Sequence, residues 1–223
     1  AAAAHKAGAL VVADNTFLSP AGQSPLELGA DIVLHSTTKY INGHSDVVGG
    51  AVVAKDPELV EELAWWANCL GITGSPFDSF QTMRGLRTLN VRYRQHEENA
   101  AAVVEFLEGH PRVEKVYYPG LASHPGHDVA ARQQKSFGAM ISFELKGDES
   151  AVPSFLEQLQ LFTLAESLGG VESLVAHPCT MTHAAMAAED HAAAGLSSRL
   201  LRLSIGIEHA GDLIADLERG LNG

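Results

Sequence analysis

A lysine that follows two hydroxyl residues is the first group in this sequence that could do chemistry. Residues 35–40 read HSTTKY, with Ser36 and Thr38 placed three positions and one position before Lys39. The two hydroxyls can bind a phosphate while the amine reaches an aldehyde. A lysine that forms an imine must lose its proton, which burial and nearby positive charge favour. The same residue types occur in ordinary surface loops, so this segment alone leaves a plain loop lysine open.

A carboxylate at the end of another short apolar run changes that balance. Asp14 ends the run VVAD and lies 25 residues before Lys39. In open α/β sheets, ligands bind beyond the carboxyl ends of the strands. An ionised carboxylate there can keep a pyridine nitrogen protonated, which the electron-accepting ring of pyridoxal phosphate (PLP) requires. Alone, Asp14 could cap a turn or helix; on a strand end beside that of Lys39, it predicts a PLP site.

Short apolar runs rich in Val predict the strands that position these residues. The first three lie at 9–13, 31–35 and 47–53, and each is apolar on both faces, as in strands buried in a mixed or parallel sheet. A helix is then predicted to begin at Asp56 and Pro57, a capping residue and a good first-turn residue, and to end before Gly71. Its apolar face contains Leu59, Leu63 and Trp66.

The second half of the chain continues the alternation of helices and strands. One long helix is predicted over 77–107, polar in its middle, as a bridge between two lobes. The remaining predicted elements are strands at 113–117, 139–145 and 200–205 and helices at 152–159 and 210–221. This order of elements indicates the α/β class.

Longer motifs carry a resemblance to a known family. Residues 14–17 (DNTF) and 36–46 (STTKYINGHSD) resemble the cofactor region of the Cys/Met-metabolism PLP enzymes. The resemblance continues through 84–89 (RGLRTL), 164–170 (LAESLGG) and 201–208 (LRLSIGIE), and so spans almost the whole chain. It implies a PLP-dependent, aspartate-aminotransferase-like (type I) α/β fold. Two domains are expected: residues 1–97 as the remainder of the PLP-binding large domain and 98–223 as the C-terminal small domain.

The resemblance also implies roles for the residues at the predicted cofactor site. Lys39 would bind the cofactor aldehyde and then move protons between substrate carbons. Asp14 would pair with the pyridine nitrogen. Ser36 and Thr38 would bind the phosphate, and Thr16 would lie against one face of the ring.

Three further residues are implied to bind the amino-acid substrate. Arg202 would hold its α-carboxylate through a bidentate guanidinium, which lysine could not do as well. Ser167 would help to place that carboxylate and the Lys39 amine, and Glu166 would suit the substrate amino group. Without the family, Arg202 reads as a strand-end ion pair and Ser167 as a helix cap.

The start of the chain leads to a further expectation. It begins AAAAHKAG, without Met and without the pattern of a signal peptide, in what looks like the middle of a helix. The family's first segment, with its cofactor-stacking tyrosine, glycine-containing phosphate loop and the Tyr/Arg pair lent by a neighbouring subunit, has no counterpart here. A polypeptide whose first residue is Ala1 is expected to bind PLP weakly.

The family catalyses reactions at the γ-carbon of amino acids, and two of them stay open. Residues 64–68 and 71–74 look like bacterial cystathionine γ-synthases, which favours addition of cysteine to an O-acylhomoserine to form cystathionine. Residues 118–121 are also similar to γ-lyases, which makes cystathionine γ-lyase, or a related β- or γ-lyase, the alternative. A non-catalytic fragment of the same fold is the reading from another class. The resemblance further implies a homotetramer built from dimers.

Composition excludes several classes of partner. The net charge of −12 disfavours nucleic acid and anionic membranes, and no apolar run is long enough to span a bilayer. Two cysteines, Cys69 and Cys179, form no disulfide framework, which indicates the cytoplasm. Cys179, His177 and His183 could suit zinc, but no second cysteine pair supports it, so no metal is expected.

Overall fold

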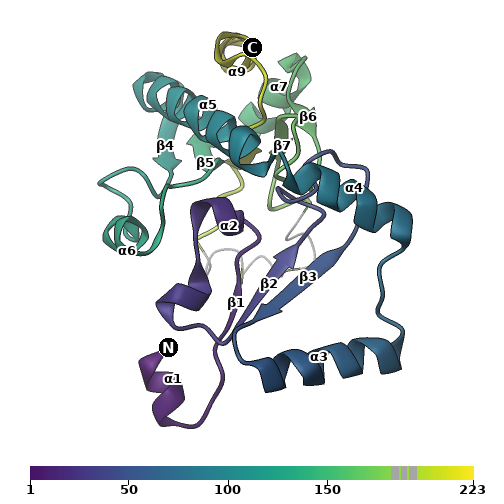
Figure 1. Ribbon diagram of the computed structural model, residues 1–223. Coiled ribbons are helices and arrows are strands. Elements are labelled where there is room, and N and C mark those ends of the chain that lie inside the picture. Colours follow the sequence, from purple (N-terminus) through teal and green to yellow (C-terminus); the bar gives the residue numbers. More distant parts are fainter. Residues whose placement is uncertain (182–185, 187–189, 191–194) are drawn as a thin grey trace.

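The computed structural model describes residues 1–181, 186, 190 and 195–223, and these form two β-sheets. In the first sheet, β1 (Val12–Asp14) pairs in parallel with β2 (Ile32–Ser36), which pairs antiparallel with β3 (Gly50–Ala54). The second sheet has the order β4-β5-β8-β7-β6. Its strands are β4 (Val113–Tyr117), β5 (Met140–Leu145), β6 (Thr163–Leu164), β7 (Leu174–Ala176) and β8 (Leu200–Ser204). The sheets occupy separate parts of the molecule (Figure 1), and together with the helices they confirm the α/β class.

Five helices of the first half lie before, between and after the strands of the three-stranded sheet in the chain. They are α1 (Ala2–Lys6), α2 (Ser19–Gly22), the 3₁₀ helix η1 (Pro25–Leu28), α3 (Pro57–Leu70) and α4 (Pro76–Leu86). Helix α3 begins as predicted, because the Asp56 carboxylate accepts hydrogen bonds from the N–H groups of Glu58 and Leu59. Gly71 ends it in the left-handed conformation.

The predicted apolar face of α3 is only partly right. Leu59 and Leu63 are half-buried, whereas Trp66 is exposed. The half-buried face continues instead at Ala67, one helical turn after Leu63. Trp66 lies beside Trp65, with ring centroids 4.8 Å apart, on the part of the helix that no described residue covers.

The single helix predicted over 77–107 is wrong. The structure has two helices, α4 and α5 (Leu89–Gly109), separated at Arg87 and Thr88. The Thr88 hydroxyl donates to the carbonyl of Gly85, a local bond that competes with continued helical pairing. A Cβ at Gly85 would collide with the backbone of Ile41 and Asn42, so the chain approaches the loop after Lys39 closely at this point.

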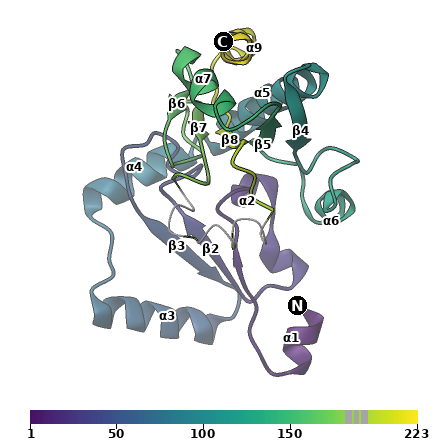
Figure 2. The same cartoon turned by 180° about the vertical axis from the view of Figure 1, so that it is seen from behind.

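The large hydrophobic core lies in the second half, between the five-stranded sheet and its helices. Strand β5 alternates between buried and half-buried residues, as expected for a sheet with one face on a core. Helices α5, α7 (Ala151–Gln158) and α9 (Ala210–Asn222) supply the other half of this core. Figure 2 shows α7 and α9 on the side away from β1–β3, with α6 (His127–Gln133) at the edge. Helix α5 also contacts α2.

Within the described residues, the first strands are not all buried on both faces. Val12 in β1 and Val52 and Val53 in β3 are exposed, and only the central strand β2 is largely buried. Strands β1 and β3 form the two edges of this small sheet.

The expected domain boundary at residue 97 falls inside α5, between the two sheets, and the domain division stays a prediction. Within the described ranges, no helix combines the length and apolar character needed to cross a membrane.

Candidate active site

The predicted cofactor residues of the first half meet at the ends of two neighbouring parallel strands. Asp14 is the last residue of β1 and pairs with Leu34 of β2, which ends two residues later at Ser36. Thr16 joins the two ends: its backbone N–H donates to Asp14 Oδ1 over 2.9 Å, and its hydroxyl oxygen accepts the N–H of Ser36 over 2.8 Å. The parallel pairing therefore brings Asp14, Thr16 and Ser36 together.

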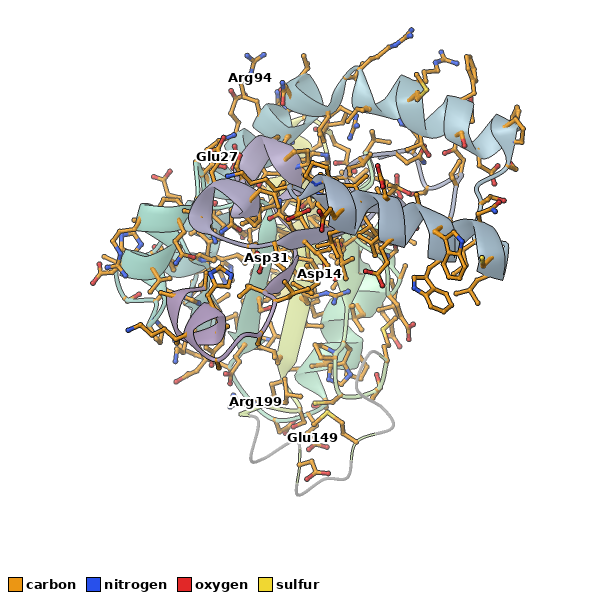
Figure 3. The ribbon with its side chains drawn as sticks, turned by 60° about the horizontal axis from the view of Figure 1, so that its bottom comes forward. Asp14, Glu27, Asp31, Arg94, Glu149 and Arg199 are labelled. Carbon is orange, nitrogen blue, oxygen red and sulfur yellow. The ribbon has the colours of Figure 1, made fainter. Side chains whose placement is uncertain are left out.

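Asp14 stays ionised at neutral pH. Hydrogen bonds from the side chain and the backbone N–H of Thr16 hold the pKa of Asp14 below its usual value, and the nearby His35 acts in the same direction. Burial lowers the pKa of His35 in turn. Figure 3 shows Asp14 near the middle of that view, whereas Arg94 projects at the edge of the molecule. The carboxylate is available to a cationic or protonated partner.

The Lys39 amine meets a residue from the other half of the chain. Lys39 Nζ donates to Ser167 Oγ over 2.9 Å, across 128 residues of sequence. Burial and then the positive charge of Arg202 lower the pKa of Lys39. An amine with a lowered pKa loses its proton more readily, as a nucleophile towards an aldehyde must.

The two predicted phosphate ligands differ in their surroundings. The Thr38 hydroxyl donates to the carbonyl of Gly49 over 3.2 Å and accepts the Gly49 N–H over 3.0 Å. The hydroxyl of Ser36 has no hydrogen-bond partner among the described residues and is half-buried. A phosphate could therefore bind Ser36 directly, whereas Thr38 would share or exchange its bonds to Gly49.

Arg202 is the middle residue of β8, a strand with neighbours on both sides in the second sheet, and so does not lie at a strand end. It pairs with Ser142 of β5 and Ala176 of β7. Because neighbouring residues of a strand point to opposite faces, Arg202 points away from the core that Leu201 and Leu203 enter. The reading of Arg202 as a strand-end ion pair is wrong, since it forms no salt bridge within the described part of the chain.

The Arg202 guanidinium holds the segment that carries Ser167. Its Nη2 donates to the carbonyls of Glu166 over 2.8 Å and Ser167 over 3.4 Å. Burial lowers the pKa of Arg202, which the exposed Glu166 carboxylate partly offsets. No described residue accepts a hydrogen bond from Nη1, so the guanidinium can still donate hydrogen bonds to a carboxylate.

The set of groups fits PLP, with a role for each part of the molecule. The cofactor presents a phosphate, an aldehyde and a pyridine nitrogen. The strand ends provide a hydroxyl without a protein partner at Ser36, a partly buried amine at Lys39 and an ionised carboxylate at Asp14.

Two of the three residues considered for zinc lie within the described part of the chain, and both have other partners there. His177 Nδ1 lies 2.8 Å from Thr180 Oγ1, and its Nε2 lies 2.8 Å from the carbonyl of Ser198. Cys179 Sγ donates to the carbonyl of Ser197. His183 lies outside the described residues. Within the described ranges, no three His, Cys, Asp or Glu residues are grouped to hold a metal ion.

Two residues that contact the site carried no prediction of a role. Arg92 had been only one of the polar residues in the middle of the helix, yet it donates to the carbonyls of Tyr40 and Ile41. Gly169 packs against Tyr40, which follows Lys39. The spacing of Arg92 and His96, one helical turn apart on a helix with an apolar face, was the signal that could have indicated a buried polar role.

Comparisons with known proteins identify the family of this chain. The family model of the Cys/Met metabolism PLP-dependent enzymes matches residues 1–222. Cystathionine gamma-synthase of Escherichia coli K12 is 63% identical over 217 residues, or 97% of this chain and 56% of that protein. Cystathionine gamma-lyase of Dictyostelium discoideum is 53% identical over 218 residues, or 98% and 56%. The chain thus spans little more than half the length of these relatives.

A solved structure extends the comparison to the fold. Cystathionine gamma synthase from Xanthomonas oryzae pv. oryzae, in complex with aminoacrylate and cysteine, superposes with a TM-score of 0.96 at 70% identity. The match covers 99% of this chain and 57% of that chain. The predicted fold, part of a PLP-dependent type I fold, is confirmed.

Proposed function

Because this chain belongs to the family of Cys/Met-metabolism PLP-dependent enzymes, we propose that the complete gene product is a transsulfuration enzyme acting at the γ-carbon of amino acids. The activity proposed first is that of a cystathionine γ-synthase, which joins an O-acylhomoserine and cysteine and releases the carboxylic acid. The observation that carries the proposal is the Lys39–Ser167 contact, which places an amine of lowered pKa beside the strand of Arg202.

Each residue of the site has a task in such a reaction. PLP, when bound, supplies an electron-accepting ring. Asp14 would keep the pyridine nitrogen protonated, Ser36 and Thr38 would bind the phosphate, and Thr16 would lie against the ring. These four residues come from the two strand ends, which the Thr16 hydrogen bonds hold together.

The remaining residues act on the substrate. Arg202 binds the α-carboxylate, and Glu166 attracts the substrate amino group. The Lys39 amine accepts, at its Nζ, the proton of the substrate α-carbon and returns that proton to another carbon of the substrate. The Ser167 hydroxyl accepts a hydrogen bond from the same Nζ and so orients it.

A γ-lyase is the second candidate. It would convert cystathionine and water into cysteine, a 2-oxo acid and ammonia. The 53% identity to the Dictyostelium discoideum γ-lyase supports it. The higher identities, 63% and 70%, belong to two proteins named as γ-synthases, which supports the synthase.

We also propose a homo-oligomer in the cytoplasm. Large apolar side chains of α3 and α4 are exposed, among them Trp65 at 57%, Phe77 at 71% and Phe80 at 62%. Contiguous exposed apolar surface can mark an interface between protein chains. Both cysteines are free thiols, which suits a reducing compartment. Sedimentation of the complete gene product tests the assembly, and a monomer would contradict it.

The test of the cofactor site is a visible absorption spectrum of the complete gene product with PLP. Wild type should show the band of a lysine-bound PLP, and Lys39→Ala should lose it. Lys55→Ala is the matched control, because Lys55 is an exposed lysine at the end of the first sheet. A band that survives in Lys39→Ala would contradict the assignment of Lys39, and no band in wild type would contradict the function and leave a non-catalytic fold.

Product assays then separate the two activities. The synthase predicts cystathionine from O-succinylhomoserine and cysteine at a higher kcat/KM than release of 2-oxo acid from cystathionine. The reverse order of the two values would favour the lyase. The same assays with Lys39→Ala show whether either product depends on the proposed site.

A further inference from the structure

Three polar side chains form a buried stripe along one face of α5. Arg92, His96 and Asn99 are spaced by four and three residues, which places them on the same side of a helix. Their exposures are 5%, 0% and 1%. Buried polar groups are retained where they have hydrogen-bond partners. In this stripe the partners belong to the two segments that carry the proposed catalytic and substrate-binding residues.

Arg92 holds the loop that follows Lys39. Its Nη1 donates to the carbonyl of Tyr40 over 2.9 Å, and its Nη2 donates to that of Ile41 over 3.2 Å. Nη2 also donates to the carbonyl of Gly85 over 2.8 Å, where α4 ends. Nε donates to the Thr88 hydroxyl oxygen over 3.1 Å. One guanidinium therefore ties the two residues after Lys39 to the junction between α4 and α5.

Burying the Arg92 guanidinium costs free energy, so the groups that it binds indicate what the residue is for. No salt bridge to Arg92 occurs among the described residues, so a buried cation is compensated by neutral carbonyl groups. Burial lowers the pKa of Arg92, in line with that cost. The planar guanidinium can reach several acceptors in fixed directions, which an ammonium group cannot do.

His96 and Asn99 hold the segment that follows the strand of Arg202. His96 Nδ1 lies 2.6 Å from the carbonyl of Ile205. Asn99 Nδ2 donates to the carbonyls of Gly206 over 3.0 Å and Glu208 over 2.7 Å. The same helix face thus contacts the chain on both sides of the site.

The loop that carries Ser167 lies between these two segments. Gly169 N donates to Ser204 Oγ over 2.8 Å, at the end of the Arg202 strand. Val171 N donates to the carbonyl of Gly43 over 2.9 Å, in the loop after Lys39. We call the residues from Lys39 to Gly43 the lysine loop, those from Ser167 to Val171 the serine loop, and β8 with Arg202 the arginine strand. These three segments are therefore joined to one another as well as to α5.

We propose that the buried stripe of α5 is a positioning device for the active site, and that Arg92 is the positioning residue that sets Lys39 against Ser167. Arg92 touches no reacting atom; it acts through the carbonyls of the lysine loop. The inference rests on the proposed function of Lys39 as the cofactor lysine.

The experiment uses the complete gene product with PLP and the conservative variant Arg92→Lys. Lysine keeps the charge but cannot hold the carbonyls of Tyr40, Ile41 and Gly85 together. Its kcat should fall by about 10²-fold, the cost of misplacing a catalytic group by about 1 Å, with little change in KM. The midpoint of the pH titration of the PLP band should also move, which a loss of stability alone would not cause.

Arg94→Lys is the matched control on the same helix. Arg94 is exposed, pairs with Glu98 at 3.8 Å and projects from the edge of the molecule (Figure 3). The kcat of Arg94→Lys should stay within twofold of wild type, and the midpoint of its PLP-band titration should equal that of wild type within error. A second variant, Thr88→Val, removes only the acceptor of Arg92 Nε and the local bond to Gly85, and should show a smaller change in the same direction.

The outcomes separate this inference from the proposed function. Wild-type kcat and titration in Arg92→Lys would overturn the positioning role while leaving Lys39 as the cofactor lysine. If Arg92→Lys does not fold, Thr88→Val decides, and a wild-type titration and kcat in that variant would overturn the role. No PLP band in wild type would contradict the proposed function, and the positioning role with it.

Discussion

Gly169→Ala tests how tightly the serine loop packs on the lysine loop. Gly169 has a φ of +75°, in the left-handed region that side chains rarely adopt. A Cβ added there would lie 2.9 Å from the backbone N and 2.9 Å from the ring Cδ2 of Tyr40. Tyr40 is fully buried and its backbone is held by Arg92, so neither group can move away cheaply.

The magnitude has two parts. Placing alanine in the left-handed conformation costs about 1–2 kcal/mol. Crowding a closely packed site costs about 1–3 kcal/mol more, so the free energy of unfolding should fall by about 2–5 kcal/mol. Gly71→Ala is the matched control, because Gly71 has a φ of +69° and nothing within 4 Å of the added Cβ. It should lose only the conformational part, about 1–2 kcal/mol.

Urea unfolding of both variants measures the difference, and kinetics add a second readout. Gly169→Ala should also lower kcat, because the serine loop must move away from Lys39, whereas Gly71→Ala should leave kcat unchanged. Equal losses of unfolding free energy in the two variants would refute the packing argument. A large loss of stability with wild-type kcat would show that the loop relaxes without disturbing the Lys39–Ser167 contact.

Three further predictions concern hydrogen-bonded acids and the lysine contact. Asp216 is 2% exposed and accepts three backbone N–H groups, so Asp216→Asn should lower the unfolding free energy by about 2–4 kcal/mol in urea. Burial opposes ionisation of Asp216, but these hydrogen bonds leave the pKa of Asp216 lowered. The contribution of Asp216 to the free energy of unfolding should therefore be present above about pH 4 and disappear as the pH falls through the lowered pKa. A difference in stability between wild type and Asp216→Asn that persists unchanged at lower pH would contradict this. Ser167→Ala removes the partner of Lys39 Nζ and should reduce kcat by about 10- to 100-fold, the equivalent of a hydrogen bond to a charged group, with PLP still bound in the absorption spectrum; an unchanged kcat would exclude that contact from the reaction. Asp14→Asn should lower kcat by about 10²- to 10³-fold, whereas Asp31→Asn, an acid before the start of β2, should not; similar losses in the two variants would remove the special role of Asp14.

Local patterns in the sequence were enough to locate several elements and the proposed cofactor residues. The run 200–205 and the helix at 210–221 correspond closely to β8 and α9. Asp56 was recognised as a helix cap, and the cap hydrogen bonds are present. The strand end at Asp14, and that of β2 to within one residue of the predicted run 31–35, followed from apolar runs, because strand periodicity and capping depend on residues close together in the chain.

The tertiary structure decided which distant residues meet. Lys39 and Ser167 are 128 positions apart, and Arg92 finds its carbonyl partners about 50 positions away. The break of the predicted long helix at Thr88 also depended on packing. Such contacts are selected by the free energy of the whole fold, in which burial of one surface determines the partners of another, so no local pattern contains them.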